Sequence, residues 1–217
     1  MTQIWDYRYC HQLGPTAEWA EAITDITISQ TALQALAMRD PLTTLYNRRH
    51  FIELANQEIT RSACFSYPVT LLLIDIDHFK AVNTTYGHLA GDTVLRDIAL
   101  QIKQNLRQSD ILARYGGTTF IVLMPQTNQS QAWIGAERLR QVIANPFCNG
   151  STQLLVTASI GLSCWPASPA STTLRSRPHL QELISRADQA LYRSKQSGRN
   201  QTQAEAWFPL VHGTISE

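Results

Sequence analysis

The sequence lacks a surplus of charge and any long apolar run. Its formal net charge is +1 over 217 residues, whereas a general nucleic-acid-binding protein usually carries a clear basic excess. Its longest apolar run lies near residues 69–74 and is far too short to span a bilayer. The N-terminal residues include charges and show no apolar run of the kind that marks a signal peptide. We therefore expect a protein with neither a membrane span nor a nucleic-acid partner.

Cysteine is also scarce, and Cys10, Cys64, Cys148 and Cys164 form no C-x-x-C pair. Buried free thiols in a reducing cytoplasm are the interpretation that fits this pattern. The six histidines lack the spacing of metal ligands, so a zinc site is not expected. A hydrophobic content of 44% with 16% charged residues is typical of a globular protein, which we expect to be cytoplasmic.

Residues 1–27 are predicted to form two short strands around the turn signal Gly14-Pro15. Their end, Glu21 to Thr27, resembles the last strand of a PAS sensor domain, in which Asp-Ile-Thr commonly precedes an output helix. Two strands cannot form a PAS pocket, so the segment is either a PAS-like C-terminal remnant or a hairpin on the main domain. Residues 28–39 have apolar side chains at helical spacing, which predicts a connector helix. Dimerisation through this helix is a hypothesis.

Beyond residue 40 the chain alternates helical and strand patterns. Gly116 and Gly117 suit a tight hairpin between two strands, because glycine accepts a positive φ. The order of elements predicts an α+β sandwich, in which helices cover a mostly antiparallel central sheet. Residues 201–217 form a tail without an assignment. The expected helices are 48–63, one from about 77, 92–106, 130–144 and 180–197, and the expected strands are 69–75, 111–115, 120–124 and 154–162.

Two aspartates, Asp75 and Asp77, stand at the end of the buried strand 69–75. Alternation along a strand places both carboxylates on the same face. Carboxylates at a strand end, beside the start of a helix, can hold a hard cation next to an anion cradle, which suits Mg²⁺ with a triphosphate. An equally good interpretation of Asp77 is that it caps the helix that follows.

Five motifs follow one another along the chain: Asp40-Pro41-Leu42-Thr43-Thr44-Leu45-Tyr46-Asn47-Arg48-Arg49, Asp75-Ile76-Asp77-His78-Phe79-Lys80, Asn83 with Gly87-His88 and Gly91-Asp92, Arg114-Tyr115-Gly116-Gly117-Thr118-Thr119-Phe120, and Arg186-Ala187-Asp188 continuing to Gly198-Arg199-Asn200. Together they resemble the GGDEF family, the diguanylate cyclases, which join two GTP into cyclic di-GMP. The resemblance extends over roughly residues 38–200 and assigns a GGDEF domain to residues 40–200. It implies a nucleotidyl-cyclase-like fold with a ferredoxin-like palm.

The resemblance implies a GTP pocket with Mg²⁺ as its metal. Asp75 and the Ile76 carbonyl would ligate that metal. Asn83 and Asp92 would read the guanine edge above Leu95, because a carboxylate accepts from guanine N1–H and N2–H₂ groups that adenine cannot supply. The implied phosphate-binding residues are His78, Phe79, Lys80, Lys195 and Arg199. For Lys195 and Arg199 the alternative is a solvated charge near a helix end.

The family carries two acidic residues after the glycine pair, and here Thr118 and Thr119 replace them. In the family the first is a metal ligand beside Asp75, and the second carboxylate is also needed. A threonine hydroxyl is a poor Mg²⁺ ligand and no general base near neutral pH. Losing such electrostatic stabilisation typically costs on the order of 10²-fold in rate per group. The sequence therefore predicts a degenerate GGDEF domain without intact catalytic residues, which still binds guanine nucleotide.

Arg107 and Asp110 stand upstream of the glycines at the spacing of the family's inhibitory site, which binds cyclic di-GMP. An arginine can fork onto a phosphate or a guanine edge, and an aspartate can accept from guanine. In a domain without activity the same site could serve as a receptor. A helix-end arginine with a capping aspartate is the plainer alternative.

The hypothesis from the sequence is thus a regulator that binds cyclic di-GMP or GTP and acts as a homodimer or as a heterodimer with another signalling protein. Two alternatives stay open. One is an active diguanylate cyclase in which Asp75, Asp77 and the substrate phosphates hold the metal. The other is an interaction module that binds no nucleotide and regulates another signalling enzyme.

Overall fold

The computed structural model describes residues 38–145, 147–149, 152–166 and 179–205. The predictions for the segment 1–27, for nearly all of the connector 28–39 and for the tail beyond residue 205 lie outside this part of the chain. The described residues from Arg39 onward belong to one compact unit, which carries the sheet. No helix among the described residues is long and apolar enough to cross a membrane.

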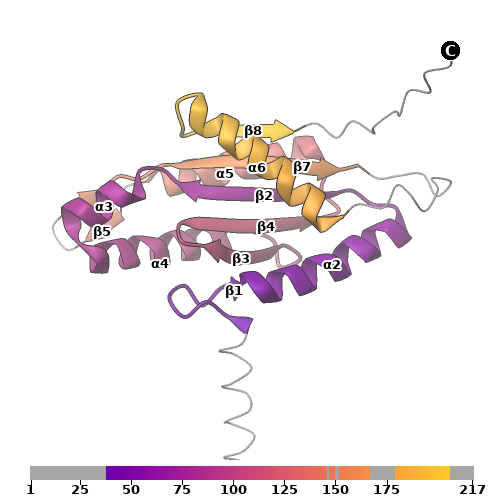
Figure 1. Ribbon diagram of the computed structural model, residues 1–217, viewed down its shortest axis with the longest axis horizontal. Coiled ribbons are helices and arrows are strands. Elements are labelled where there is room, and N and C mark those ends of the chain that lie inside the picture. Colours follow the sequence, from indigo (N-terminus) through magenta and orange to yellow (C-terminus); the bar gives the residue numbers. More distant parts are fainter. Residues whose placement is uncertain (1–37, 146, 150–151, 167–178, 206–217) are drawn as a thin grey trace, which may run out of the picture. The chain divides into compact units, whose positions relative to one another are not determined.

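A six-stranded sheet is formed, in this order, by β1 (Tyr46–Asn47), β3 (Ile111–Gly116), β4 (Thr119–Pro125), β2 (Val69–Ile76), β7 (Ala158–Trp165) and β8 (Thr202–Glu205) (Figure 1). The central strand β2 pairs antiparallel with β4 and β7, and β3 pairs antiparallel with β4. The edge strands β1 and β8 pair in parallel with β3 and β7. The mostly antiparallel sheet predicted from the sequence is confirmed.

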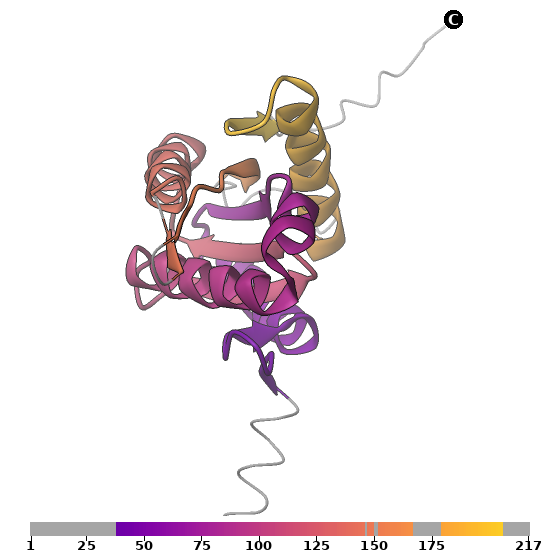
Figure 2. The same cartoon turned by 90° about the vertical axis from the view of Figure 1, so that its left-hand side faces the viewer.

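Helices cover both faces of this sheet: α2 (Arg48–Phe65), α3 (Phe79–Tyr86), α4 (His88–Gln104), α5 (Gln129–Ile143) and α6 (Leu180–Gln196). Helices α4 and α5 lie on one face, and α2 and α6 lie on the other (Figure 2). This is the helix-covered α+β architecture that the sequence predicts. The helices begin and end close to their expected limits, apart from the start of α4.

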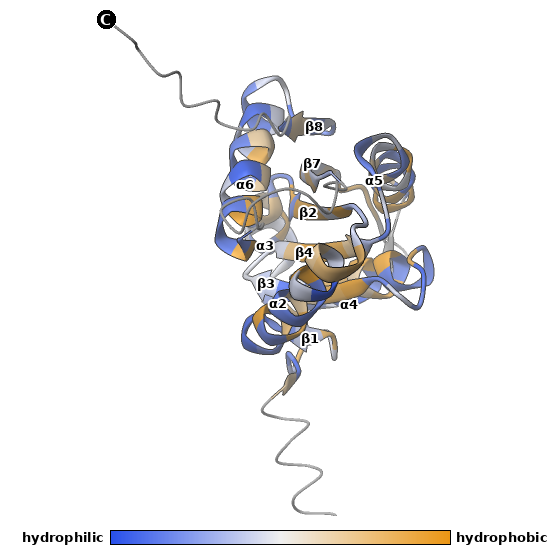
Figure 3. Cartoon of the chain, turned by 90° about the vertical axis from the view of Figure 1, so that its right-hand side faces the viewer, coloured by the Kyte–Doolittle hydropathy of each residue, from blue (hydrophilic) through white to orange (hydrophobic). Residues whose placement is uncertain are grey.

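Strand β2 divides the core between the two faces. Successive side chains of a strand point to opposite sides, so Leu72 and Ile74 pack with α4 and α5, whereas Leu71 and Leu73 pack with α2 and α6. All four are at most 2% exposed. Apolar residues accordingly gather between sheet and helices, as Figure 3 shows. Asp75 is the first charged residue along this strand, and its side chain is only partly buried, between the buried Ile74 and Ile76.

Two expected element boundaries are wrong. The strand expected over 154–162 is β7, which starts at Ala158, while Leu154 ends β6 (Thr152–Leu154), a short strand paired with β5 (Phe147–Asn149). The helix expected from residue 92 begins at His88, because Gly87, with φ 82°, serves as its N-cap. Glycines 87 and 91 make this segment look like a loop, although Gly91 is packed inside the helix.

The edge strand β8 and one thiol are further departures from the sequence-based predictions. Strand β8 carries polar side chains, so no apolar alternation announces it. Its ladder with β7 and a hydrogen bond from the Thr202 hydroxyl to Glu137 Oε1, 2.6 Å long, hold it instead. Of the two cysteines whose side chains are described, Cys164 is buried as expected, whereas Cys64 is exposed near the end of α2.

Candidate nucleotide-binding site

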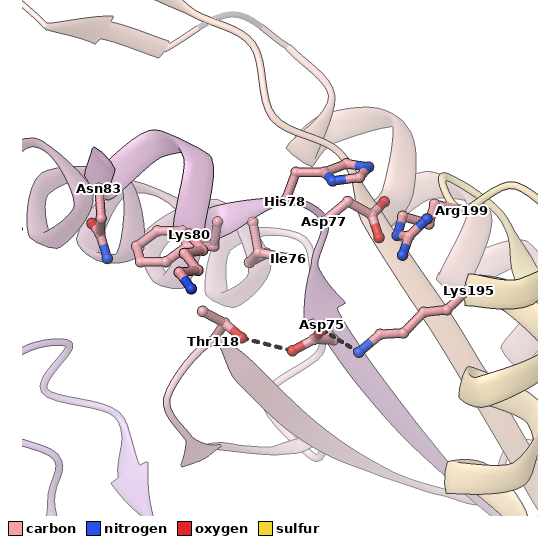
Figure 4. A pocket seen from close by; sticks show the side chains of 10 residues that line it. Asp75, Ile76, Asp77, His78, Lys80, Asn83, Thr118, Lys195 and Arg199 are labelled. Atoms are coloured by element: carbon pink, nitrogen blue, oxygen red, sulfur yellow. Dashed lines mark hydrogen bonds and ion pairs between the residues drawn. The ribbon is translucent and has the colours of Figure 1, made fainter. Parts of the chain in front are cut away.

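The hairpin between β3 and β4 places both threonines on Asp75. The antiparallel register sets Thr119 opposite Asp75, and Gly117, with φ 39°, closes the turn beside them. The Thr118 and Thr119 hydroxyls both donate to Asp75 Oδ1, at 2.8 and 2.9 Å. Lys195 Nζ lies 2.5 Å from Asp75 Oδ2 (Figure 4). Both oxygens of this carboxylate therefore have partners within the protein.

This donor set matches Mg²⁺ poorly. Mg²⁺ in proteins is usually held by carboxylates together with substrate phosphates. Here Asp75 is a single carboxylate with a lysine counter-ion and two neutral hydroxyls. The described residues contain no group of three His, Cys, Asp or Glu side chains that could hold a metal ion. The role of Asp75 and of the Ile76 carbonyl as metal ligands stays a prediction.

Asp77 has a structural task at the same edge of the sheet. It is 5% exposed and accepts from the hydroxyls of Thr157 and Ser159, at 2.8 and 2.7 Å. The backbone N–H of Asn200 donates to it as well, at 3.1 Å. The N-cap of α3 is His78, in a left-handed conformation and without a side-chain capping bond. The interpretation of Asp77 as the cap of α3 is therefore wrong. The Asp77 side chain instead ties the end of β2 to β7 and to the segment after α6.

A cavity of about 450 Å³ opens at this edge. In Figure 4, Lys80 and Asn83 of α3 line it on one side, and Lys195 and Arg199 line it on the other. Six of the eight residues predicted to bind GTP line this cavity, together with both predicted metal ligands. The full set of lining residues is Asp75, Ile76, Asp77, His78, Phe79, Lys80, Asn83, Thr118, Lys195 and Arg199.

Asp92 and Leu95 do not line the cavity. Leu95 is 3% exposed and belongs to the core beside α4. Asp92 follows Gly91, where an added Cβ would lie 1.9 Å from Asn83 Oδ1, so the glycine allows α3 and α4 to approach closely. Asn83 Oδ1 is itself buried and has no hydrogen-bond partner. A buried acceptor without a donor is unfavourable, and it lies where the sequence predicts a guanine contact.

A second cavity, of about 400 Å³, contains Arg107 and Asp110. The backbone N–H of Arg107 donates to Asp110 Oδ2 at 2.9 Å, whereas Asp110 Oδ1 is buried and unpaired. Burial raises the pKa of this carboxyl above its usual value, although Arg107 and Arg138 oppose the change. Asp110 bonds within its own turn, six residues past the end of α4 at Gln104, rather than capping that helix.

Sequence reasoning missed several residues of this second cavity. Arg39 and Lys103 add two cations to Arg107, and Tyr46 adds an aromatic wall that the Arg39 guanidinium covers at 5.1 Å. Arg39 and Tyr46 both come from the start of the domain: Tyr46 pairs with Ala113 in the β1–β3 ladder, and Arg39 forms an isolated antiparallel bridge with Tyr46. A basic residue near a domain boundary has no sequence signal that separates it from a solvated charge.

A mixed six-stranded sheet between two helical layers, with a glycine hairpin against a strand-end aspartate, defines the cyclase palm class of α+β domains. Residues 37–201 match the family described as diguanylate cyclase, GGDEF domain. The chain therefore belongs to the GGDEF family.

Named relatives agree with this assignment. The chain is 42% identical over 168 residues to the response regulator PleD of Caulobacter vibrioides, covering 76% of this chain and 35% of PleD. It thus spans about a third of that relative's length. The coiled coil and GGDEF domain of DgcB from Caulobacter crescentus, solved in complex with c-di-GMP, superpose with a TM-score of 0.73 at 28% identity, covering 87% of this chain and 98% of that one. The diguanylate cyclase SiaD of Pseudomonas aeruginosa, solved with its activator SiaC, gives 0.70 at 34% identity, covering 87% and 70%.

Proposed function

We propose that this chain is a degenerate GGDEF domain that makes no cyclic di-GMP and regulates cyclic di-GMP signalling in the cytoplasm by binding guanine nucleotide. One observation carries the proposal. The two hairpin side chains beside Asp75 are hydroxyls that donate hydrogen bonds to its carboxylate. They offer neither the charge that holds a divalent cation nor a base that takes a proton from an attacking hydroxyl.

The competing function is an active cyclase whose metal is held by Asp75, Asp77 and the substrate phosphates. The hydrogen bonding of Asp77 argues against it. Each Asp77 oxygen accepts from a hydroxyl, and one also accepts from a backbone N–H. Metal ligation would have to replace these bonds, and with them the ties between β2, β7 and the residues after α6.

The proposed first ligand is cyclic di-GMP in the cavity of Arg107 and Asp110. Three cationic side chains there, Arg39, Lys103 and Arg107, suit the two phosphates of a cyclic dinucleotide. The unpaired oxygen of Asp110 can accept from guanine N1–H or N2–H₂ and so gain the partner that it lacks. DgcB, which this chain resembles, was solved in complex with c-di-GMP.

GTP in the cavity of Asp75 is the proposed second ligand. Lys80, Lys195 and Arg199 would meet its phosphates, and Asn83 would meet the guanine. Asp92, for which the sequence predicts the same guanine contact, does not line the cavity. Asn83 lines the same cavity and carries the amide group that would meet the guanine edge.

Partner proteins remain part of the proposal. The regulator would act as a homodimer or by pairing with another signalling protein, and SiaD shows that a relative is found with an activator protein. An interaction module that binds no nucleotide is the alternative. Nucleotides that prefer the native state must raise its melting temperature, so thermal shifts with cyclic di-GMP and GTP separate the two functions.

The decisive test of lost chemistry is cyclic di-GMP formation from GTP and Mg²⁺. We expect no product from the unmodified chain and detectable product from the double variant Thr118→Asp/Thr119→Glu. Product from the unmodified chain would contradict the proposal. If both proteins are inactive, the two threonines alone do not explain the loss of activity, and the site has a second defect.

The receptor proposal is tested by calorimetric titration with cyclic di-GMP. Arg107→Ala should abolish binding, because it removes a phosphate-binding guanidinium from the cavity. Arg96→Ala is the matched control, since Arg96 is an exposed residue of α4 outside that cavity. Unchanged affinity in the Arg107 variant would overturn the receptor proposal.

A further inference from the structure

We infer that the Asp75 cavity binds guanine nucleotide without a metal ion. Thr118 and Thr119 stand in place of two carboxylates, and they leave the site with the net charge that one bound divalent cation would otherwise supply. This inference rests on the proposed GTP cavity and specifies the state of the ligand in it: the free nucleotide, with its full phosphate charge, rather than the Mg²⁺ complex.

The first step is the charge of the site. The carboxylates of Asp75 and Asp77 and the cations Lys80, Lys195 and Arg199 line the cavity, which leaves a formal charge of one positive unit. Thr118 lines the cavity and Thr119 bonds to Asp75, so acidic residues at both positions would lower the charge around Asp75 by two units. Binding of one divalent cation would then bring the net charge back to the one positive unit of the unmodified chain. Replacing two carboxylates by neutral hydroxyls therefore equals, in net charge, the binding of one Mg²⁺.

The second step is the geometry around the carboxylate that remains. Asp75 is 13% exposed at its side chain, so its charge is weakly screened by solvent. Lys195 lies 2.5 Å from one oxygen, and both threonine hydroxyls donate to the other. The carboxylate is thus neutralised and hydrogen-bonded by the chain itself. A metal ion would have to displace Lys195 and find its remaining ligands elsewhere.

The third step concerns the groups left for phosphate. Within the part of the chain that the structure describes, the side chains of Lys80 and Arg199 form no ion pair or hydrogen bond. They face the cavity from α3 and from the segment after α6 (Figure 4). Two unpaired cations on opposite walls suit a polyphosphate that carries its own charge. Mg²⁺ on the phosphates would cancel part of that charge and weaken the attraction.

The experiment is calorimetric titration of the unmodified chain with GTP, once in EDTA and once in excess MgCl₂ at equal ionic strength. We expect the dissociation constant in EDTA to lie within about threefold of the value in Mg²⁺, or below it. Binding that is lost in EDTA would overturn the inference while leaving the GTP cavity in place. Binding under neither condition would remove the cavity as a nucleotide site, and the separate titration with cyclic di-GMP would still test the receptor proposal.

Two double variants test the cause. Thr118→Asp/Thr119→Glu should lose at least about tenfold of its GTP affinity when Mg²⁺ is replaced by EDTA, because two like charges then face the phosphates. In Thr118→Asn/Thr119→Gln the new side chains have the size of Asp and Glu but carry no charge. The GTP affinity of this variant should be the same in Mg²⁺ and in EDTA. Equal metal dependence of the two double variants would assign the effect to side-chain size and overturn the electrostatic cause. Circular dichroism of both proteins confirms that they are folded.

Discussion

Asp40 and Arg114 form an ion pair, with Arg114 Nη1 3.1 Å from Asp40 Oδ1, and the same guanidinium donates to the Gly117 carbonyl at 2.7 and 3.0 Å. Asp40 is the first residue after the predicted connector 28–39, and Gly117 precedes Thr118 in the chain. One side chain thus joins the entrance of the domain to the hairpin of the candidate site. The hairpin is thus tied through Arg114 to a residue that precedes Arg114 by 74 positions.

Arg114→Met should destabilise the domain by about 1–3 kcal/mol, because it leaves Asp40 and the Gly117 carbonyl without their shared donor. The two side chains of the pair are only 16% and 17% exposed, so solvent replaces the lost bonds incompletely. Urea unfolding measures the change. Arg96→Met, which removes an exposed arginine from α4, should stay within about 0.5 kcal/mol of the unmodified chain. Equal stability of both variants would show that the pair has no structural role.

The same pair should make the domain sensitive to acid. Burial raises the pKa of Asp40, but hydrogen bonds from Thr43 and Arg114 outweigh it and hold the pKa below its usual 3.8. Burial of Glu137 is likewise outweighed by Arg140 and Thr202, which hold its pKa below 4.5. Since the unfolded chain binds protons more readily than the native state here, the stabilisation is full above these ordinary values. It is lost as the pH falls through the lowered native pKa values.

We therefore expect the melting temperature to decline below a pH of about 4.5, and Asp40→Asn to show a shallower decline. The variant has no carboxylate at position 40 to protonate, so it starts lower at neutral pH and loses less in acid. Thermal unfolding followed by circular dichroism between neutral pH and pH of about 3 is sufficient. Parallel curves for the two proteins would mean that Asp40 does not contribute to acid sensitivity.

Asp110→Asn should weaken the binding of cyclic di-GMP without lowering the stability of the domain. Burial raises the pKa of Asp110, so its negative charge is a cost to the ligand-free domain at neutral pH. The neutral amide removes that cost and can still accept from the Arg107 N–H. We expect a melting temperature that is unchanged or higher by about 1–2 °C, after allowance for partial exposure. Affinity for cyclic di-GMP should fall at least about tenfold, because an amide accepts more weakly from guanine. A lower melting temperature would assign Asp110 a structural role.

Replacing glycine by alanine should have different effects at two positions, Gly161 and Gly91: loss of stability at the first and loss of GTP affinity at the second. At Gly161 a Cβ would lie 2.1 Å from the Ala187 carbonyl oxygen and 2.2 Å from Leu191 N, so Gly161→Ala forces α6 off β7. At Gly91 the nearest atom is Asn83 Oδ1, the end of a side chain that can rotate away. Gly161→Ala should cost more than about 3 kcal/mol of stability. Gly91→Ala should stay folded and lose GTP affinity because Asn83 is displaced; calorimetry and urea unfolding together check both outcomes.

The sequence predicts the fold well wherever burial creates a pattern. The run Leu71 to Ile74 and the glycine pair place β2 and the hairpin correctly, because core packing and turn geometry constrain residue type strongly. The edge strand β8 escapes prediction because its backbone pairing needs no particular side chain. The same holds for Asp77, whose partners Thr157 and Ser159 lie 80 and 82 positions away. Hydrogen bonds between distant polar residues leave no periodic trace.

Lys195→Met gives a further test of the inference that the Asp75 cavity binds GTP without a metal ion. Without Lys195, the Asp75 carboxylate keeps its threonine bonds but loses its counter-ion, so its charge faces the incoming phosphates. We expect GTP affinity to fall at least about tenfold more in EDTA than in Mg²⁺, because a cation can then take the place of the lost ammonium group. Calorimetric titration under both conditions measures the difference.

Arg199→Met is the matched control for this last variant. Arg199 lines the same cavity without pairing with Asp75, so its loss should weaken GTP binding by a similar factor with and without Mg²⁺. A Lys195 variant that loses affinity equally under both conditions would make Lys195 an ordinary phosphate contact. The ion pair with Asp75 would then be a feature of the empty cavity only, and neutralisation by the threonines alone would have to explain any metal-independent binding.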